Sequence, residues 1–257
     1  PRDWSSDVCS SDLASRAVQV GFVVVLIALW YLGTVYWGIS PLLLPNPVKV
    51  WAELKDVLAT GEFWPDLKVT LSELAIAFAI SSISGITIGY LVSRSQYLIK
   101  VFEPLFAGIY SVPIILFLPL YVLFFGLGPG SKIALGTTIS FFPIVLNTIA
   151  GFGYVEKIFV TAARSMGASD VQMFRHVLLP AAFPVILTGL RIGFTITLLS
   201  ILGSETIASL AGLGHKIVHL AEAMETARMF AYIAFAVAIA ATLNTVTSSL
   251  ERRAKRQ

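Results

Sequence analysis

Long, uninterrupted apolar stretches are the feature that most constrains how this chain can fold. Of its 257 residues, 56% are hydrophobic and only 13% are charged, whereas about a quarter of a typical soluble domain is charged. Several of the apolar stretches reach about 20 residues, the length at which an α-helix crosses the hydrocarbon core of a bilayer. The net charge of +3 is too small to indicate nucleic-acid binding. The sequence therefore predicts an all-α, polytopic membrane protein.

The apolar stretches predict about six transmembrane helices. Between the first two, Pro45 and Pro47 interrupt any helix, and Val48, Trp51 and Leu58 then recur at helical spacing. That pattern favours a helix lying in the membrane interface. We place the membrane spans near residues 17–37, 71–92, 105–125, 133–151, 184–203 and 229–247.

Residues 1–13 differ in composition from the rest of the chain, because they are polar, rich in Ser and Asp and without an apolar period. We interpret them as a non-native or disordered tail, with a short native polar segment as the alternative. Residues 14–257 are then a single transmembrane domain. Cys9 is the only cysteine, so the sequence predicts no intramolecular disulfide and no thiolate metal cluster.

Two of the spans carry packing signals. Ser81, Gly85 and Gly89 recur every four residues, so another backbone can approach closely along that stripe. Pro113 and Pro119 each remove a backbone donor from the third span. Broken helices at membrane depth are tolerated only against protein or a water-filled cavity. We therefore place the third span beside a translocation path, with simple kinked packing as the alternative.

Arg191 and Glu205 are the charges nearest the membrane in the fifth span. A charge there is costly unless it snorkels, pairs or lines water, so structural pairing and a substrate role both remain open for these two residues. Small, polar or helix-breaking positions are further candidates for facing the path. These candidates are Ser111, Pro113, Asn147, Thr195 and Ser200.

A polar segment, residues 156–180, separates the fourth and fifth spans. Its first part predicts a short helix up to Met166, and Gly167 stands where a left-handed helix cap is needed. Ser169 and Gln172 have the spacing of a capping box, which predicts the start of a second short helix. Pro180 predicts the start of a new segment. The segment is therefore expected to be a helix-turn-helix hairpin that docks onto something outside the membrane.

The hairpin also carries a motif. Thr161-Ala162-Ala163, Gly167 and Val177-Leu178-Leu179-Pro180 have the spacing of the EAA loop, and the chain here resembles the membrane subunits of binding-protein-dependent ABC importers of the nitrate, sulfonate and taurine type. Thr161 replaces the usual Glu and Val177 the usual Ile; outside the loop, Glu73 replaces an expected Arg and Ala77 an expected Gly. Further matching positions are Ser111-Val112-Pro113, Leu118-Pro119-Leu120, Gly126-Leu127-Gly128, Gly189-Leu190-Arg191 and Gly212-Leu213-Gly214.

The resemblance implies a division of labour between subunits. The hairpin would be a coupling helix seated in a groove on a separate ABC ATPase subunit, which would bind ATP and Mg. Two permease copies, expected to be a homodimer, would form the pathway, and an extracytoplasmic substrate-binding protein would deliver the solute. By this resemblance the ATPase-docking residues are Thr161, Ala162, Ala163, Gly167, Ala168, Val177, Leu179 and Pro180.

The same resemblance implies a transport subunit that is not itself an enzyme, binds no cofactor or metal, and contacts membrane lipid but no nucleic acid. The implied solute is small and anionic or organic. Sulfonates, taurine, nitrate, bicarbonate and thiamine-precursor-like compounds all fit.

The distribution of basic residues predicts the orientation in the membrane. With about six spans, both termini lie on one side, together with the hairpin. Lys and Arg are more frequent on that side, including Arg252, Arg253, Lys255 and Arg256 after the last span. The positive-inside rule then puts both termini and the hairpin in the cytoplasm, and the resemblance implies that the membrane is a bacterial plasma (inner) membrane.

Two other classes of protein fit the sequence less well. An ion-coupled secondary transporter or a channel would show inverted repeats and acidic residues inside the spans, and the sequence shows neither clearly. A membrane enzyme would need a catalytic acid, nucleophile or metal cluster in a span. The glycine-rich segment 126–132 lacks the residue order of a phosphate-binding loop, and His215 and His219 lack the glutamate of a zinc-protease motif.

Overall fold

In the computed structural model, which describes residues 4–36 and 38–254, the described residues form helices and turns with no strand. The predicted all-α class is therefore confirmed. Contacts within the chain group it into two compact units. Unit 1 comprises residues 1–62 and 217–235, and unit 2 comprises residues 63–216 and 236–257.

Unit 1 is built from α1, α2 and adjoining parts of two later helices. The α2 helix begins where the Asn46 side chain accepts a 2.9 Å hydrogen bond from the Val48 amide, with Pro47 at the first helical position. It ends at Gly61, whose φ is +70°. The predicted amphipathic helix is therefore present. The elements are α1 (Trp4–Tyr36), α2 (Pro47–Thr60), the second part of α10 (Leu213–Glu222) and the first part of α11 (Thr226–Ala254).

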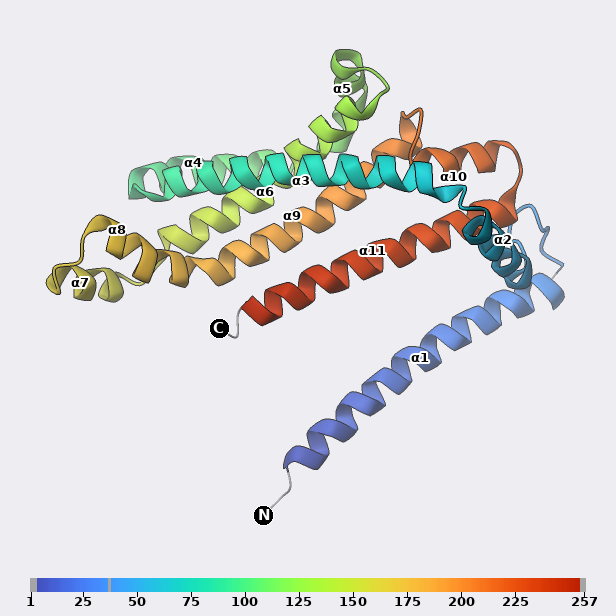
Figure 1. Ribbon diagram of the computed structural model, residues 1–257, viewed down its shortest axis with the longest axis horizontal. Helices are drawn as coiled ribbons and strands as arrows, with labels where there is room; N and C mark the ends of the chain where they lie inside the picture. The colour runs from blue at the N-terminus through green and yellow to red at the C-terminus, as the bar shows by residue number, and fades with distance from the viewer. Residues whose placement is uncertain (1–3, 37, 255–257) are drawn as a thin grey trace. The chain divides into compact units, whose positions relative to one another are not determined.

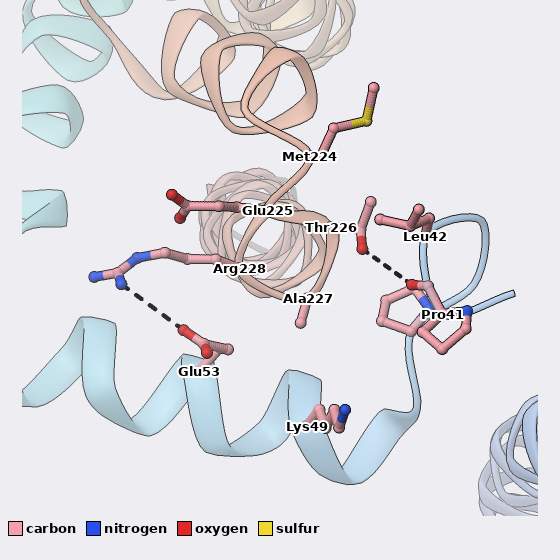
Figure 2. Close-up of a pocket in the computed structure, with 10 residues that line it drawn as sticks. Pro41, Leu42, Lys49, Glu53, Met224, Glu225, Thr226, Ala227 and Arg228 are labelled. Atoms are coloured by element: carbon pink, nitrogen blue, oxygen red, sulfur yellow. Dashed lines mark hydrogen bonds and ion pairs between the residues drawn. The ribbon is translucent and has the colours of Figure 1, made fainter.

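An arginine at the start of α11 holds unit 1 together. Arg228 donates a 2.8 Å hydrogen bond to Glu62 and lies 3.5 Å from Asp56 and 3.9 Å from Glu53. Figure 2 shows its guanidinium directed at Glu53, in a pocket of about 380 Å³. Nearby, the Thr226 hydroxyl donates a 3.0 Å hydrogen bond to the Pro41 carbonyl.

Unit 2 contains three long helices that pack against one another, α3, α6 and α9 (Figure 1). The α6 helix packs against both of the others. In chain order the elements are α3 (Phe63–Ser93), α4 (Gln96–Tyr110), η1 (Ile114–Phe117), α5 (Leu118–Phe125), α6 (Pro129–Gly153), α7 (Lys157–Ser165), α8 (Asp170–Met173), η2 (Phe174–Leu178) and α9 (Leu179–Ile207), with the start of α10 and the end of α11.

Glycines allow α6 to approach its two neighbours closely. A Cβ atom on Gly89 of α3 would lie 2.6 Å from the Thr148 Cβ, and one on Gly85 would lie 2.8 Å from the Ile144 Cγ2. On the other side, a Cβ on Gly193 of α9 would lie 2.6 Å from the Ile144 Cγ1. No side chain larger than hydrogen fits at these separations, so the predicted close approach along the Ser81, Gly85 and Gly89 stripe is confirmed.

Four helices in the described residues are long and apolar enough to cross a membrane, and a fifth span is added if one bent helix pair counts as one crossing. In α1, the apolar segment is shorter and comprises Gly21–Tyr36. The total of six spans therefore stays a prediction. The α1 helix begins at Trp4, and the interpretation of residues 1–13 as a non-native or disordered tail also stays a prediction.

The third span is broken, as its prolines led us to expect, but it begins earlier than the predicted bounds of 105–125. The α4 helix begins already at Gln96 and ends at Tyr110, and the following η1–α5 pair is bent from it by 71°. Pro113 causes the break, because it has no amide proton and disfavours helical backbone at Val112. Pro119 causes none, because it lies in the first turn of α5, where its missing donor is not needed.

The fifth span also begins earlier than predicted. Helical backbone runs without interruption from Asp170 to Ile207, 38 residues, and Pro180 lies in the first turn of its α-helical part, α9. The π-helical turn η2 precedes Pro180, and at the end of this turn the Leu179 amide donates a hydrogen bond to the Phe174 carbonyl. This wider turn carries the helix past the position where Pro180 supplies no donor.

Gly89→Ala should destabilise the protein, whereas Gly203→Ala should not. The first substitution forces a Cβ against Thr148, and overpacking of this kind costs about 1–3 kcal/mol. The second adds a Cβ at a helical glycine with no atom within 4 Å. Thermal unfolding in detergent micelles measures both. An equal unfolding temperature for the two variants would contradict the packing described here.

Candidate functional site

The polar segment forms the predicted hairpin, with α7 and α8 at one end of α9 (Figure 1). Aromatic packing fixes its base to unit 2. The Phe174 ring lies 5.3 Å from that of Tyr90 in α3 and 6.0 Å from that of Phe152 in α6. Met173 beside it is buried. The hairpin is therefore held at its base and projects from it.

A separate hydrogen bond holds the segment that leads from α6 into the hairpin. The Tyr154 hydroxyl donates a 2.8 Å hydrogen bond to Glu103 in α4. Because the carboxylate stabilises the protonated phenol, this hydrogen bond raises the pKa of Tyr154.

The turn after α7 is a complete Schellman motif. The Gly167 amide donates to the Arg164 carbonyl at 3.0 Å, and the Ala168 amide donates to the Ala163 carbonyl at 3.1 Å. Gly167 has a φ of +77°, and no atom lies within 4 Å of where its Cβ would be. Glycine is therefore favoured here by backbone conformation and not by lack of space, which confirms the predicted cap.

The second half of the hairpin begins with the predicted capping box. The Ser169 amide donates to the Gln172 side chain at 2.9 Å, and the Gln172 amide donates to the Ser169 hydroxyl at 3.4 Å. Two amides at the start of the helix are thus satisfied by neighbouring side chains. This reciprocal pair explains why the helix begins at Asp170 and leads straight into η2 and α9.

The tip of the hairpin exposes large apolar side chains. Met166 is 87% exposed and Val171 74% exposed, and Ile158 and Phe159 on α7 are exposed as well. Large apolar side chains exposed on a projecting hairpin are a feature of interaction surfaces. The tip is therefore the part of the hairpin where a partner would cover exposed apolar surface, whereas the base is already packed against unit 2.

A groove of about 410 Å³ lies on the hairpin between α7 and the α8–η2 segment. Four of the predicted docking residues line it: Ala163, Gly167, Ala168 and Val177. Of the remaining four, Thr161 and Ala162 are exposed on α7, and Leu179 and Pro180 are exposed at the start of α9.

Three groove residues lay outside the predicted set. Met166, Gln172 and His176 also line the groove. The His176 ring lies there because its Nδ1 is 3.2 Å from the Gln172 carbonyl, one turn earlier in the helix. Two of them could have been found from helical spacing, because Met166 lies three residues after Ala163 and His176 lies four residues after Gln172.

The candidate pathway residues are placed at two kinds of position. Ser111 and Pro113 are exposed at the break after α4. Asn147, Thr195 and Ser200 lie within α6 and α9 and are half-buried or buried. Asn147 donates to the Pro143 carbonyl at 2.8 Å and Thr195 to the Arg191 carbonyl at 3.0 Å, whereas the buried Ser200 hydroxyl has no hydrogen-bond partner in the described chain. Their role in a pathway stays a prediction.

Both charges of the fifth span have structural partners. Arg191 pairs with Glu251 of α11 at 3.0 Å, and Thr188 donates to the same carboxylate at 3.1 Å. Glu205 accepts hydrogen bonds from Thr70 and from the Gly214 amide. These contacts favour structural pairing over a substrate role for both residues.

The arrangement is suited to binding another protein rather than to catalysing a reaction. The apolar tip and groove offer a surface that another protein can grip. Behind them, continuous helix from Asp170 to Ile207 connects that surface to the far end of unit 2. The α9 helix has Pro184 inside it but no loop between its ends.

The chain is similar to known transport proteins. Residues 81–256 match the model of a protein family described as "Binding-protein-dependent transport system inner membrane component". The taurine transport system permease protein TauC of Escherichia coli (strain K12) is 32% identical, over 92% of this chain and 88% of its own length. The putative aliphatic sulfonates transport permease protein SsuC of Bacillus subtilis (strain 168) is 29% identical, over 89% and 83%.

The fold is also similar to that of a solved transporter. A chain in the crystal structure of an amino acid ABC transporter with histidines has a TM-score of 0.62 and 23% sequence identity, covering 79% of this chain and 97% of that one. At this identity the match concerns the fold alone.

Gly167→Ala should loosen the hairpin turn more than Gly167→Asn. A left-handed conformation costs a residue with a Cβ about 1–2 kcal/mol, and Asn tolerates it better than Ala. We therefore expect about tenfold faster hydrogen exchange at the Ala168 amide in the Ala variant, and a smaller change in the Asn variant. Unchanged exchange in the Ala variant would show that the turn does not depend on the glycine.

Proposed function

We propose a working arrangement for this chain, which belongs to the family of binding-protein-dependent transport system inner membrane components: its hairpin docks on a separate ATPase subunit, and α9 conveys the movement of that subunit into the membrane. The chain is the permease subunit of an ABC importer. It is a multi-pass membrane protein whose partners are an ATPase and a substrate-binding protein.

The projecting hairpin is the observation that carries the docking proposal. Its base is fixed by Phe174, while Met166 and Val171 at the tip are exposed. A partner that covered the tip would remove this apolar surface from water. The groove beside it, lined by Ala163 and Gly167, accommodates a side chain of the partner.

The proposed mechanism is a shift between two arrangements of the helices. ATP and Mg bind to the ATPase subunits and favour one arrangement of those subunits. The hairpin follows its ATPase subunit, and α9 follows the hairpin. In this arrangement the permease carries no catalytic group for ATP hydrolysis, which takes place on the partner.

A second copy of the chain completes the proposed pathway. The broken segment after α4 supports this, because Ser111, Val112 and Pro113 are exposed there. Irregular backbone at membrane depth has to be covered by protein or to line water. A homodimer in a bacterial inner membrane, with the hairpins and both termini in the cytoplasm, meets that requirement.

The proposed solute is a small organic sulfonate. The support is that two relatives carry names referring to taurine and to aliphatic sulfonates, over most of the length of this chain.

Met166→Glu should abolish docking without unfolding the permease. Met166 is exposed, so the substitution places a charge in the proposed interface and disturbs little else. We expect a loss of at least about 30-fold in affinity for the ATPase, corresponding to about 2 kcal/mol for an interface hot spot. Tyr97→Glu, at another exposed residue, is the matched control. Copurification and ATP-driven uptake of taurine measure the effect, and normal uptake by the Met166 variant would count against docking.

The orientation can be tested with two engineered thiols at opposite ends of α9. In a Cys9→Ser background, Ser165→Cys in the hairpin should react with an impermeant maleimide only from the cytoplasmic side. Leu210→Cys, in the exposed turn after α9, should react only from outside. Reaction of the hairpin thiol from outside would refute the proposed docking.

A further inference from the structure

Three charged side chains are buried together at the end of unit 2 that lies opposite the hairpin. Lys132 of α6 is 0% exposed, and Glu73 of α3 and Glu205 of α9 are each 1% exposed. Electrostatic interactions connect Glu73 with both of the others. Buried charges inside membrane helices are expensive and point to function. The hydrogen bonds that each of these side chains makes indicate the role of the cluster.

Glu205 fastens the turn between α9 and α10 to α3. One of its oxygens accepts a 2.7 Å hydrogen bond from the Thr70 hydroxyl, and the other accepts a 2.8 Å bond from the Gly214 amide. The Thr70 hydroxyl in turn accepts a 3.0 Å bond from the Leu213 amide. Thr70 thus bridges the carboxylate and the turn, and both carboxylate oxygens are occupied.

Gly212 shapes the turn around that carboxylate. Its φ is +106°, and a Cβ on it would collide with the Glu205 side chain. Its amide donates a 3.2 Å hydrogen bond to Asp66 of α3. The turn therefore closes over Glu205 through two separate attachments to α3.

Lys132 fastens a second turn, between α5 and α6. Its ammonium donates to the carbonyl oxygens of Leu127 and Gly128. Both acceptors belong to the turn and neither is a carboxylate. The lysine interacts electrostatically with both acids, while its hydrogen bonds go to backbone groups of the turn.

Glu73 is the exception in this cluster. Its Oε2 atom is buried and has no hydrogen-bond partner among the described residues. A buried carboxylate oxygen without a donor is unfavourable, and packing alone gives no reason to keep it. Glu73 is instead suited to accept a hydrogen bond in a second arrangement, and the nearest cation it interacts with is Lys132.

We propose that Thr70, Glu205 and Lys132 form a latch that holds the turn between α9 and α10 closed against α3 and the turn between α5 and α6 closed against α6, and that Glu73 is the acceptor that Lys132 gains when the latch opens. The proposal rests on the proposed function and assigns these residues to the regulation of the pathway. In the proposed orientation the latch lies at the outer end of unit 2.

The α9 helix connects the latch to the docking hairpin. From Leu179 to Glu205 it rises about 39 Å, at about 1.5 Å per residue. Because its backbone is continuous, movement of the hairpin displaces Glu205 relative to Thr70 on α3. One small displacement therefore breaks the hydrogen bonds to the turn, and the turn is released.

Thr70→Val tests the closed side of the latch. It keeps the shape of the side chain and removes its hydrogen bonds to Glu205 and Leu213. In the complete complex with the ATPase, we expect about tenfold more ATP hydrolysis without binding protein, because the closed state is no longer held. Thr137→Val is the matched control, since Thr137 bonds α6 to the Ala77 carbonyl of α3 at 3.3 Å but does not touch the turn. The control should hydrolyse ATP like the wild type.

Glu73→Gln tests the open state of the latch. Unlike Thr70→Val, it should not raise ATP hydrolysis. It removes the charge that would receive Lys132, so hydrolysis without binding protein should stay low. Hydrolysis stimulated by the binding protein loaded with taurine should fall about threefold. Glu205→Gln, which removes one acceptor from the turn, serves as a second closed-side variant should Thr70→Val fail to assemble.

A thiol placed beside the latch reports its opening directly. Ser204 is buried next to Glu205, and Ser204→Cys changes little in volume. In a Cys9→Ser background this thiol should react slowly with an aqueous maleimide, and at least about tenfold faster when Thr70→Val is added. A structural role without a latch would lower stability but leave both the basal hydrolysis and the thiol unchanged.

The outcomes separate the latch from the proposed function. If the wild-type complex shows no binding protein-stimulated hydrolysis with taurine or other sulfonates and no assembly with an ATPase, the proposed function fails. If the wild type is stimulated but Thr70→Val and Glu205→Gln keep the basal rate and the protected thiol, the latch is overturned.

Discussion

The close approach of α6 to α3 and α9 is the constraint on which the rest of unit 2 depends. Gly89 and Gly193 remove the side chains that would otherwise separate the helices. In a bilayer there is little hydrophobic force between helices, so close packing of this kind supplies much of their attraction. The packing also keeps α9 beside α6 along its length, and this makes α9 stiff enough to connect distant sites.

The hairpin and the buried charges lie at the two ends of this stiff helix. At one end the side chains are apolar and exposed, as at Met166, and at the other they are charged and buried, as at Glu205. The first arrangement suits binding to another subunit, because exposed apolar surface gains from being covered. The buried charged end suits a contact that is either fully formed or fully broken. Buried hydrogen bonds to charged groups are strong when they are formed, and a charged group left with only some of its partners is costly.

Local rules predicted the hairpin well because its interactions are local. The Gly167 turn and the Ser169–Gln172 box join residues only a few positions apart, so residue type and spacing determine them. The prolines were predicted less well. Pro113 breaks a helix, whereas Pro119 and Pro180 lie in the first turns of α5 and α9, each of which follows another helical turn without a break. The same missing amide has different consequences depending on whether the neighbouring turns supply another partner, and this cannot be decided from the proline alone.

The amino-acid sequence by itself determined the helical class, the membrane setting and the hairpin with its motif, because these follow from apolar length and short-range spacing. The tertiary structure decided which charges are paired. Glu205 meets Thr70, and Arg191 meets Glu251, across many intervening residues, and only the packing of α3, α9 and α11 brings these partners together. The unpartnered oxygen of Glu73 was likewise not visible from spacing, since it results from the way three separate helices enclose it.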